Sequence, residues 1–201
     1  MPGQNAYPFP IGSGLMNPGN QQASAAKPFF LVTVEAQGYW LKPFHVNDHR
    51  VNRFLEISWC PQTRETTQKS LNSFYAGDEK QISGIFDSTT SLFIGAATLY
   101  RVNRRHGSGV LGLMIGDESY WCKCVSIGVT GMIIDHSIQD LKLRRLTGGS
   151  YAVNHGMNFT FKRLVFGCEG HYVKAAVTET GDYMDACKWT ILADEWTARA
   201  H

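Results

Sequence analysis

The sequence of 201 residues has no long hydrophobic run, no regular cysteine framework and little net charge. None of its apolar stretches approaches the roughly 20 residues that a transmembrane helix requires, so a membrane-spanning protein is not expected. Its five cysteines are an odd number without regular spacing, which argues against a small secreted domain held by disulfides. With 19 basic and 17 acidic side chains the net charge is +2, too small to indicate a polyanionic partner.

The amino-terminal segment also lacks a basic stretch followed by an apolar core, so no signal peptide is predicted and a cytoplasmic location is expected. Residues 1–27 are rich in Pro, Gly, Asn, Gln and Ala and show no hydrophobic periodicity, which predicts a disordered extension. The remaining residues, 28–201, have the length of one domain. The chain's 43% of hydrophobic residues is enough for a sizeable core.

The first part of this domain contains alternating strand and helix patterns. Runs rich in β-branched and aromatic residues predict strands, and apolar residues at helical spacing predict helices. A helix starting near His49 has a cap in Asn47 or Asp48. Strands are predicted at 29–34, 39–44, 81–86 and 92–100, with helices from about 49 and over 63–75.

The most informative stretch is a strand, a loop and a helix, followed by another strand and an asparagine. The strand covers 109–115, and the loop Trp121-Cys-Lys-Cys-Val-Ser126 leads into a helix that reaches about Gln139. A second strand covers 143–149, and Asn154 precedes a Phe-rich helix. Segments resembling a closing hairpin follow.

This order of elements resembles the acyl-CoA-binding half of the GNAT acetyltransferases, and is most similar to the branch that acetylates ribosomal-protein N-termini and amino sugars. The resemblance extends over residues 38–196. It implies an α+β fold, with a mixed, mostly antiparallel sheet of about seven strands that is splayed at its centre and flanked by helices. It also implies acetyl transfer from acetyl-CoA, as co-substrate, to a primary amine.

The resemblance further implies where acetyl-CoA is held. The family's loop, Gln/Arg-x-x-Gly-x-Gly/Ala, offers backbone N–H groups and a helix dipole to the pyrophosphate. A bulge in the preceding strand frees backbone groups for the pantetheine arm and the acetyl carbonyl, and an asparagine after the next strand pairs with the same arm. The corresponding positions here are Leu113, Met114, Ile115, Cys122, Lys123, Cys124, Val125, Ser126 and Asn154.

Several residues depart from the family pattern. Cys122 and Cys124 stand where the related branch has glycines, which serve either a positive φ angle or the close approach of phosphate. Met157 replaces the serine of the asparagine motif, and Val165 replaces a glycine. A cost of about 1–3 kcal/mol at Cys124 would weaken acetyl-CoA binding by roughly 10- to 100-fold.

Two residues are the catalytic candidates. Glu118 is predicted as the base or water relay that takes the proton of the amine, with an exposed loop carboxylate as the alternative. Tyr120 is predicted at the acceptor side, together with Tyr151 and His45.

A second hypothesis is a catalytically impaired protein of the same fold that binds acyl-CoA or a partner. It rests on the loss of glycine at Cys124, of serine at Met157 and of the tyrosine that some family members use to protonate the thiolate. Phe159 and Phe161 on the helix after Asn154 cannot supply that tyrosine. The Cys-x-Cys pair has no partners at zinc-site spacing, so no metal site is expected.

The predicted acceptor is a small-molecule amine, most specifically an amino sugar in nucleotide-linked or glycan-precursor form. Arg101, Arg104 and Arg105 can hold a diphosphate if their hairpin folds over the acceptor; otherwise they form a solvated hairpin tip. A protein N-terminus is the alternative acceptor. No nucleic-acid partner is expected, because no groove-binding element accompanies the basic group. Oligomeric state is left open.

Overall fold

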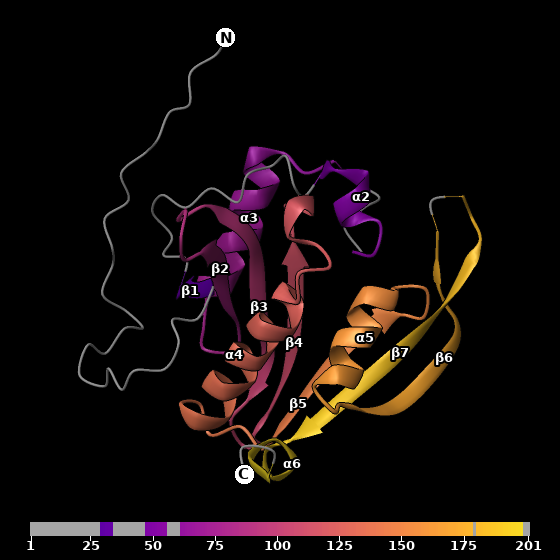
Figure 1. Cartoon of the computed structure of the whole chain (residues 1–201). Helices are drawn as coiled ribbons and strands as arrows, with labels where there is room; N and C mark the ends of the chain where they lie inside the picture. The colour runs from indigo at the N-terminus through magenta and orange to yellow at the C-terminus, as the bar shows by residue number, and fades with distance from the viewer. Residues whose placement is uncertain (1–28, 34–46, 56–60, 179, 199–201) are drawn as a thin grey trace.

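The computed structural model describes residues 29–33, 47–55, 61–178 and 180–198, the first of these ranges through the backbone alone (Figure 1). The predicted extension 1–27, the predicted strand 39–44 and His45 lie outside the described residues. No helix within the described residues is both long and apolar enough to cross a bilayer.

The described elements follow the predicted order closely. The strands are β1 (Phe29–Thr33), β2 (Gln81–Asp87), β3 (Phe93–Asn103), β4 (Ser108–Ile115), β5 (Arg145–Tyr151), β6 (Gly167–Val177) and β7 (Tyr183–Leu192). The helices are α2 (His49–Asn52), α3 (Arg64–Tyr75), α4 (Val125–Gln139), α5 (His155–Arg163) and α6 (Ala193–Thr197), with a 3-10 turn η1 (Glu118–Tyr120).

Within the described residues, these strands form one seven-stranded sheet in the order β1-β2-β3-β4-β5-β7-β6. All neighbours are antiparallel except β4 and β5, which are parallel. The β4–β5 pairing runs only from Ser108↔Arg145 to Leu111↔Gly148, and beyond it the two strands diverge (Figure 1). The predicted α+β sheet, splayed at its centre, is confirmed.

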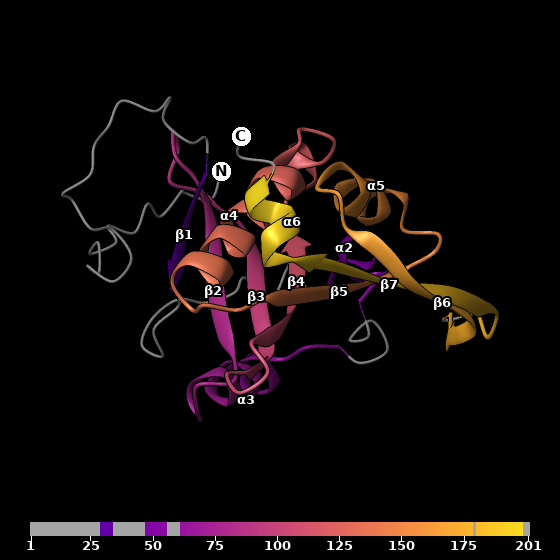
Figure 2. The same cartoon turned by 90° about the horizontal axis from the view of Figure 1, so that it is seen from below.

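The helices divide between the two faces of the sheet, with α3 on one side and α4 on the other (Figure 2). On the first side, Leu71 of α3 packs on Ile82 of β2. On the second side, the larger core joins Val129 of α4 and Phe161 of α5 to Leu111 of β4. We call these sides the α3 face and the α4–α5 face. Burial of apolar side chains on both faces stabilises the sheet at its centre.

Hydrogen bonds at the helix ends agree with the sequence. Asp48 caps α2 by accepting from the Arg50 N–H, as predicted. Thr63 and Thr66 form a reciprocal capping box at the start of α3. These caps satisfy N–H groups that have no partner inside the first turn of a helix.

The family resemblance predicted a bulge at residues 113–115, and this prediction is wrong. The β3–β4 pairing is continuous from Tyr100↔Val110 to Gly95↔Ile115, and its irregularity lies between Tyr100 and Asn103 instead. β4 therefore stays attached to β3 along its length, while β5 is attached to β7 as far as Tyr151↔Ala186. The central gap arises because β5 diverges with β7, without a kink in β4.

Candidate functional site

A cavity of about 1410 Å³ surrounds the gap between β4 and β5. Its walls come from both faces of the sheet, because alternate residues of a strand point to opposite faces. Thr98, Gly112 and Gly149 line it from the α3 face. Ser126 of α4 and Met157 of α5 line it from the α4–α5 face. The cavity therefore passes through the sheet at the gap.

The backbone of β4 presents alternate residues to this gap. The Gly109 carbonyl accepts from the Thr147 hydroxyl of β5 at 3.5 Å, whereas the Gly116 N–H donates to the Ile94 carbonyl on the β3 side. By this alternation, the backbone groups of Leu113 and Ile115 face the gap beyond the last β4–β5 pair.

The three residues predicted on this strand therefore differ in role. The Ile115 carbonyl accepts a hydrogen bond from the Trp121 indole Nε1 at 3.0 Å, which fixes the loop against the end of β4. The Met114 carbonyl turns toward β3, where a Cβ at Gly95 would collide with it. Leu113 thus offers its N–H and carbonyl to the gap, while Met114 contributes only its side chain to the lining.

Both cysteines of the predicted phosphate loop adopt left-handed backbone angles. Cys122 has φ 58°, and Cys124, the N-cap of α4, has φ 58° and ψ 13° with no side-chain cap hydrogen bond. For a residue with a Cβ this conformation costs roughly 1–2 kcal/mol. The glycines of the related branch are thus explained here by backbone angle. Both thiols are exposed and line the cavity.

The first turn of α4 offers the backbone donors that the sequence predicted. The Gly128 N–H donates to the Cys124 carbonyl at 3.1 Å, which closes the first helical turn. The N–H groups of Val125, Ser126 and Ile127 precede this bond, and these three residues line the cavity. The helix dipole makes this terminus favourable for an anion.

The side chains of this loop serve other contacts. The Ser126 Oγ lies 2.8 Å from the Thr160 Oγ1 and joins α4 to α5. Lys123 is exposed, and its Nζ lies 5.6 Å from the centre of the Tyr120 ring. Lys123 is not among the residues that line the cavity. Its contact with a phosphate stays a prediction.

Asn154 stands at the start of α5, where the sequence placed it. Its Oδ1 caps the helix by accepting from the Met157 N–H at 3.1 Å, and the residue lines the cavity. The cap leaves the Asn154 amide nitrogen as a donor for a ligand. Pairing with the cofactor arm stays a prediction.

Asn158 is a structural residue of the site that the sequence interpretation missed. Its Oδ1 accepts from the Ser150 hydroxyl at 2.6 Å and from the Trp189 indole at 3.2 Å. Its Nδ2 donates to the carbonyls of Tyr151 and Ala152 at 3.1 and 3.0 Å. Asn158 therefore fixes the end of β5 next to the gap. An amide one helical turn after Asn154 was the available signal.

The two catalytic candidates occupy different places. Glu118 Oε2 accepts from Arg50 Nη1 at 2.7 Å, its side chain is 54% exposed, and it does not line the cavity. The same guanidinium also binds Asp48. Tyr120 does line the cavity, and it hydrogen-bonds Asp87, whose carboxyl pKa is lowered mainly by the Thr90 N–H and to a smaller extent by Tyr120. The structure brings Tyr120 to the site and leaves Glu118 at its edge.

Two further residues define the chemistry of the α4–α5 face. Phe161 has no hydroxyl and therefore no proton to give. It is completely buried and stacks on Trp189 with ring centres 5.8 Å apart. Burial raises the pKa of the Cys187 thiol, which lines the cavity and therefore stays protonated near neutral pH.

The predicted arginine group is divided by the structure. Arg101 lines the cavity, whereas Arg104 and Arg105 are exposed in the turn between β3 and β4 and are not among the lining residues. The alternative of a solvated hairpin tip therefore describes Arg104 and Arg105.

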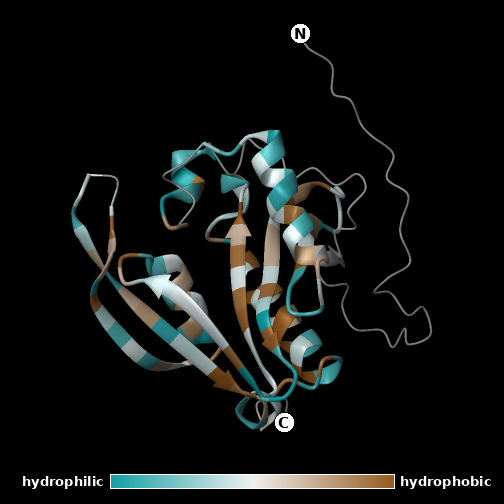
Figure 3. Ribbon diagram, turned by 180° about the vertical axis from the view of Figure 1, so that it is seen from behind, coloured by the Kyte–Doolittle hydropathy of each residue, from teal (hydrophilic) through white to brown (hydrophobic). Residues whose placement is uncertain are grey.

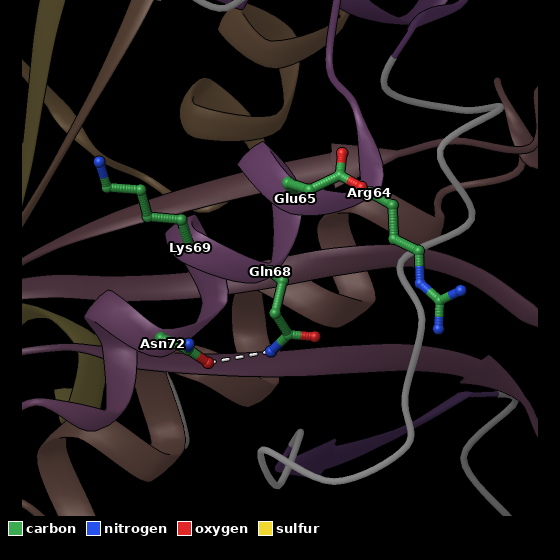
Figure 4. Close-up of a pocket in the computed structure, with 5 residues that line it drawn as sticks. All are labelled: Arg64, Glu65, Gln68, Lys69 and Asn72. Atoms are coloured by element: carbon green, nitrogen blue, oxygen red, sulfur yellow. Dashed lines mark hydrogen bonds between the residues drawn. The ribbon is translucent and has the colours of Figure 1, made fainter.

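A second hollow lies on the surface of α3, lined by Arg64, Glu65, Gln68, Lys69 and Asn72 (Figure 4). Apart from the Gln68–Asn72 hydrogen bond, its side chains point in different directions and do not converge on one point. This hollow is therefore not a candidate catalytic site.

A sequence profile described as the acetyltransferase (GNAT) domain matches residues 34–166. The chain belongs to the GNAT acetyltransferase family. Among curated proteins, none matches it significantly. Its family membership confirms the predicted class, an N-acetyltransferase that uses acetyl-CoA as the acetyl donor. The ribosomal-protein and amino-sugar branch is not confirmed.

Solved structures of GNAT acetyltransferases share the fold. Mutant forms of the spermidine/spermine N-acetyltransferase SpeG from Vibrio cholerae align with a TM-score of 0.73 at 18% identity, covering 87% of this chain and 99% of that one. Spermidine N-acetyltransferase from Vibrio cholerae, in complex with CoA and spermine, aligns at 0.75 and 17% identity, covering 85% and 98%. A putative acetyltransferase aligns at 0.67 and 18%, covering 86% and 89%. At these identities the likeness shows the fold.

Proposed function

We propose that this GNAT acetyltransferase acetylates the primary amine of a small molecule. The observation that carries the proposal is the cavity that passes through the sheet between β4 and β5. Acetyl-CoA and an amine can enter it from opposite faces and meet beside the free backbone of Leu113. Bringing two reactants together in this way contributes to catalysis through proximity and orientation.

The residues present fit acetyl-CoA, which supplies the acetyl group as a thioester. The N–H groups of Val125, Ser126 and Ile127 would hold its pyrophosphate at the start of α4. Leu113 would bind the pantetheine arm or the acetyl carbonyl through its backbone groups. A preorganised N–H next to that carbonyl stabilises the negative charge that develops during acyl transfer.

Glu118 and Tyr120 are the residues we propose for proton transfer. Because Glu118 lies outside the cavity lining, we assign it the relay function, through water, in preference to direct contact with the amine. Tyr120 lines the cavity and is the group placed to contact the amine or that water. A positioned base or relay contributes about 10²- to 10⁴-fold to the rate.

An amino sugar in nucleotide-linked or glycan-precursor form remains the acceptor that we propose in more detail. Hydroxyl and aromatic groups on the α3 face support it, since Thr98, Tyr100 and Tyr151 all line the cavity there. A structural neighbour binds spermine, so a polyamine is one alternative, and a protein N-terminus is the other. The cytoplasmic location also stays a prediction.

The test is the release of CoA thiol from acetyl-CoA in the presence of a panel of amines. The panel contains amino sugars, their phosphates and nucleotide-linked forms, polyamines and short peptides. The proposal predicts amine-dependent release with at least one small-molecule amine. Release with peptides alone would reassign the acceptor to a protein N-terminus, and no release by a protein that binds acetyl-CoA would favour the impaired, ligand-binding hypothesis.

A further inference from the structure

The α3 face of the cavity carries a cationic group that the proposed donor site does not account for. Resting on the proposed function, we propose that the amine acceptor also bears an anionic group, a carboxylate or phosphate, and that Lys188 binds it. The expected substrate is therefore an amine that also carries a negative charge, in contrast to a polycation.

Strand pairing fixes the position of Lys188. In the β5–β7 ladder Lys188 lies directly opposite Gly149, so both residues are on the same face of the sheet. This is the α3 face, because the neighbouring Ser150 bonds Asn158 of α5 on the other side. The side of the molecule that carries α3 is turned toward the viewer in Figure 3.

Open space adjoins Lys188 at the gap. A Cβ at Gly149 would have no atom within 4 Å, so the surface above this glycine is unfilled. Gly149, Lys188 and the flanking Tyr151 all line the cavity. A ligand above Gly149 would have the Lys188 ammonium on one side and the free edge of β4 on the other.

Among the described residues, the charged side chains that line the cavity are all basic. Among the described residues, the cavity lining contains no Asp or Glu, whereas Arg53 and Arg101 line it in addition to Lys188. Neither arginine has an ion pair with a described carboxylate under 4.0 Å. Arg50 also lines the cavity but is neutralised by Asp48 and Glu118.

The carboxylate nearest to Lys188 is already occupied. Glu169 Oε2 lies 3.5 Å from the Lys188 Nζ, but Glu169 is bound by Arg145 and by the Thr190 hydroxyl. Those contacts, led by Arg145, lower the Glu169 pKa to about 2, so the carboxylate stays ionised and fixed. Arg145 and Lys188 together exceed its charge by one. The ammonium therefore has capacity for a second anion.

The experiment compares amines that differ only in an anionic group: glucosamine with glucosamine 6-phosphate, ethanolamine with phosphoethanolamine, and glycinamide with glycine, with spermidine as the polycation. Wild-type protein is expected to prefer the anionic member of at least one pair and to acetylate it faster than spermidine. Lys188→Gln should raise KM for that acceptor about tenfold, the effect of losing one charge-assisted hydrogen bond. Lys188→Arg should retain the preference, and Lys188→Glu should reverse it.

Two controls separate the loss of acceptor binding at Lys188 from a general change of charge and from a change in acetyl-CoA binding. Arg104→Gln removes a cation from the hairpin tip outside the cavity. It should leave the Michaelis constants of the anionic amine and of its neutral counterpart unchanged. Acetyl-CoA affinity, measured by titration calorimetry, should be the same for wild type and Lys188→Gln.

The experiment distinguishes failure of the anionic-acceptor proposal from failure of the proposed acetyltransferase function. Faster turnover of spermidine than of every anionic amine, or an unchanged preference in Lys188→Gln, would overturn the inference and leave the proposed function intact. Absence of thiol release with every amine would overturn both.

Discussion

Three of the seven described non-glycine residues with positive φ angles match positions where the family has glycine. Cys122, Cys124 and Val165 have φ angles of 58°, 58° and 57°. All three were identified in the sequence as replacements of family glycines. The sequence left open whether glycine at the loop serves backbone angle or phosphate approach. The structure shows the positive angle, which a Cβ makes unfavourable.

We expect Cys124→Gly to stabilise the fold and tighten acetyl-CoA binding. Glycine removes the left-handed strain, although part of the gain is lost to its greater freedom in the unfolded chain. The net stabilisation should be about 1 kcal/mol or less. Calorimetric titration with acetyl-CoA measures the affinity. Weaker binding by the variant would mean that the loop has adapted around the thiol.

Val165→Gly is the matched control for that experiment. Val165 has a similar angle, is β-branched and 52% exposed, and does not line the cavity. The Val165→Gly variant should have a higher melting temperature than the wild type and the same acetyl-CoA affinity. A change of affinity in this variant would show that strain relief anywhere in the fold alters acetyl-CoA binding. The effect of Cys124→Gly could then not be attributed to its position in the phosphate loop.

The Arg50–Glu118 ion pair permits a direct test of the proposed relay. If Glu118 relays the proton, Glu118→Gln should lower kcat by about 100-fold or more, while Arg50→Gln should change it only a few-fold. If Glu118 serves only to tie α2 to the loop after β4, both variants should lower kcat equally, since each removes one charge of the same ion pair. Initial rates at saturating acetyl-CoA distinguish the two outcomes.

At the level of the elements, the sequence predicted the order and type of most of those that the structure describes. Short-range signals such as the cap at Asn47 or Asp48 and the position of Asn154 predicted where helices begin. The bulge in β4 was carried over from the resemblance and is absent, because continuous pairing with β3 holds the strand straight. Such pairing depends on residues distant in the sequence, which local patterns do not report.

The contacts of Glu169 predict an acid-sensitive attachment between β5, β6 and β7. Arg145, followed by Thr190, lowers the Glu169 pKa to about 2, below the value of about 4.3 in an unfolded chain. Its stabilising contribution is therefore complete above about pH 4.3 and is lost as the pH falls toward that folded value. Melting temperatures across this range should show wild type and Glu169→Gln converging in acid. The side chain is 40% exposed, so high salt should also narrow the difference.

At the scale of the whole molecule, one cavity connects both faces of a splayed sheet. The order of elements and the loop carried the resemblance to the family, and that resemblance implied the splay. The sequence did not predict which cations face the gap. Lys188 reaches the acceptor side only through its register with Gly149, and Arg104 and Arg105 are excluded because the hairpin tip lies outside the cavity. Long-range register, more than composition, sets the charge of the acceptor side.

The central claim is that acetyl-CoA lies in the β4–β5 gap with its pyrophosphate on the start of α4. Hydrogen exchange of backbone amides with and without acetyl-CoA tests it most directly. We expect slower exchange at Leu113 and at Val125, Ser126 and Ile127 on ligand addition. No change is expected in β6, which contributes only Tyr172 to the cavity lining. Protection confined to other segments, or no protection at a concentration where calorimetry shows binding, would contradict the claim.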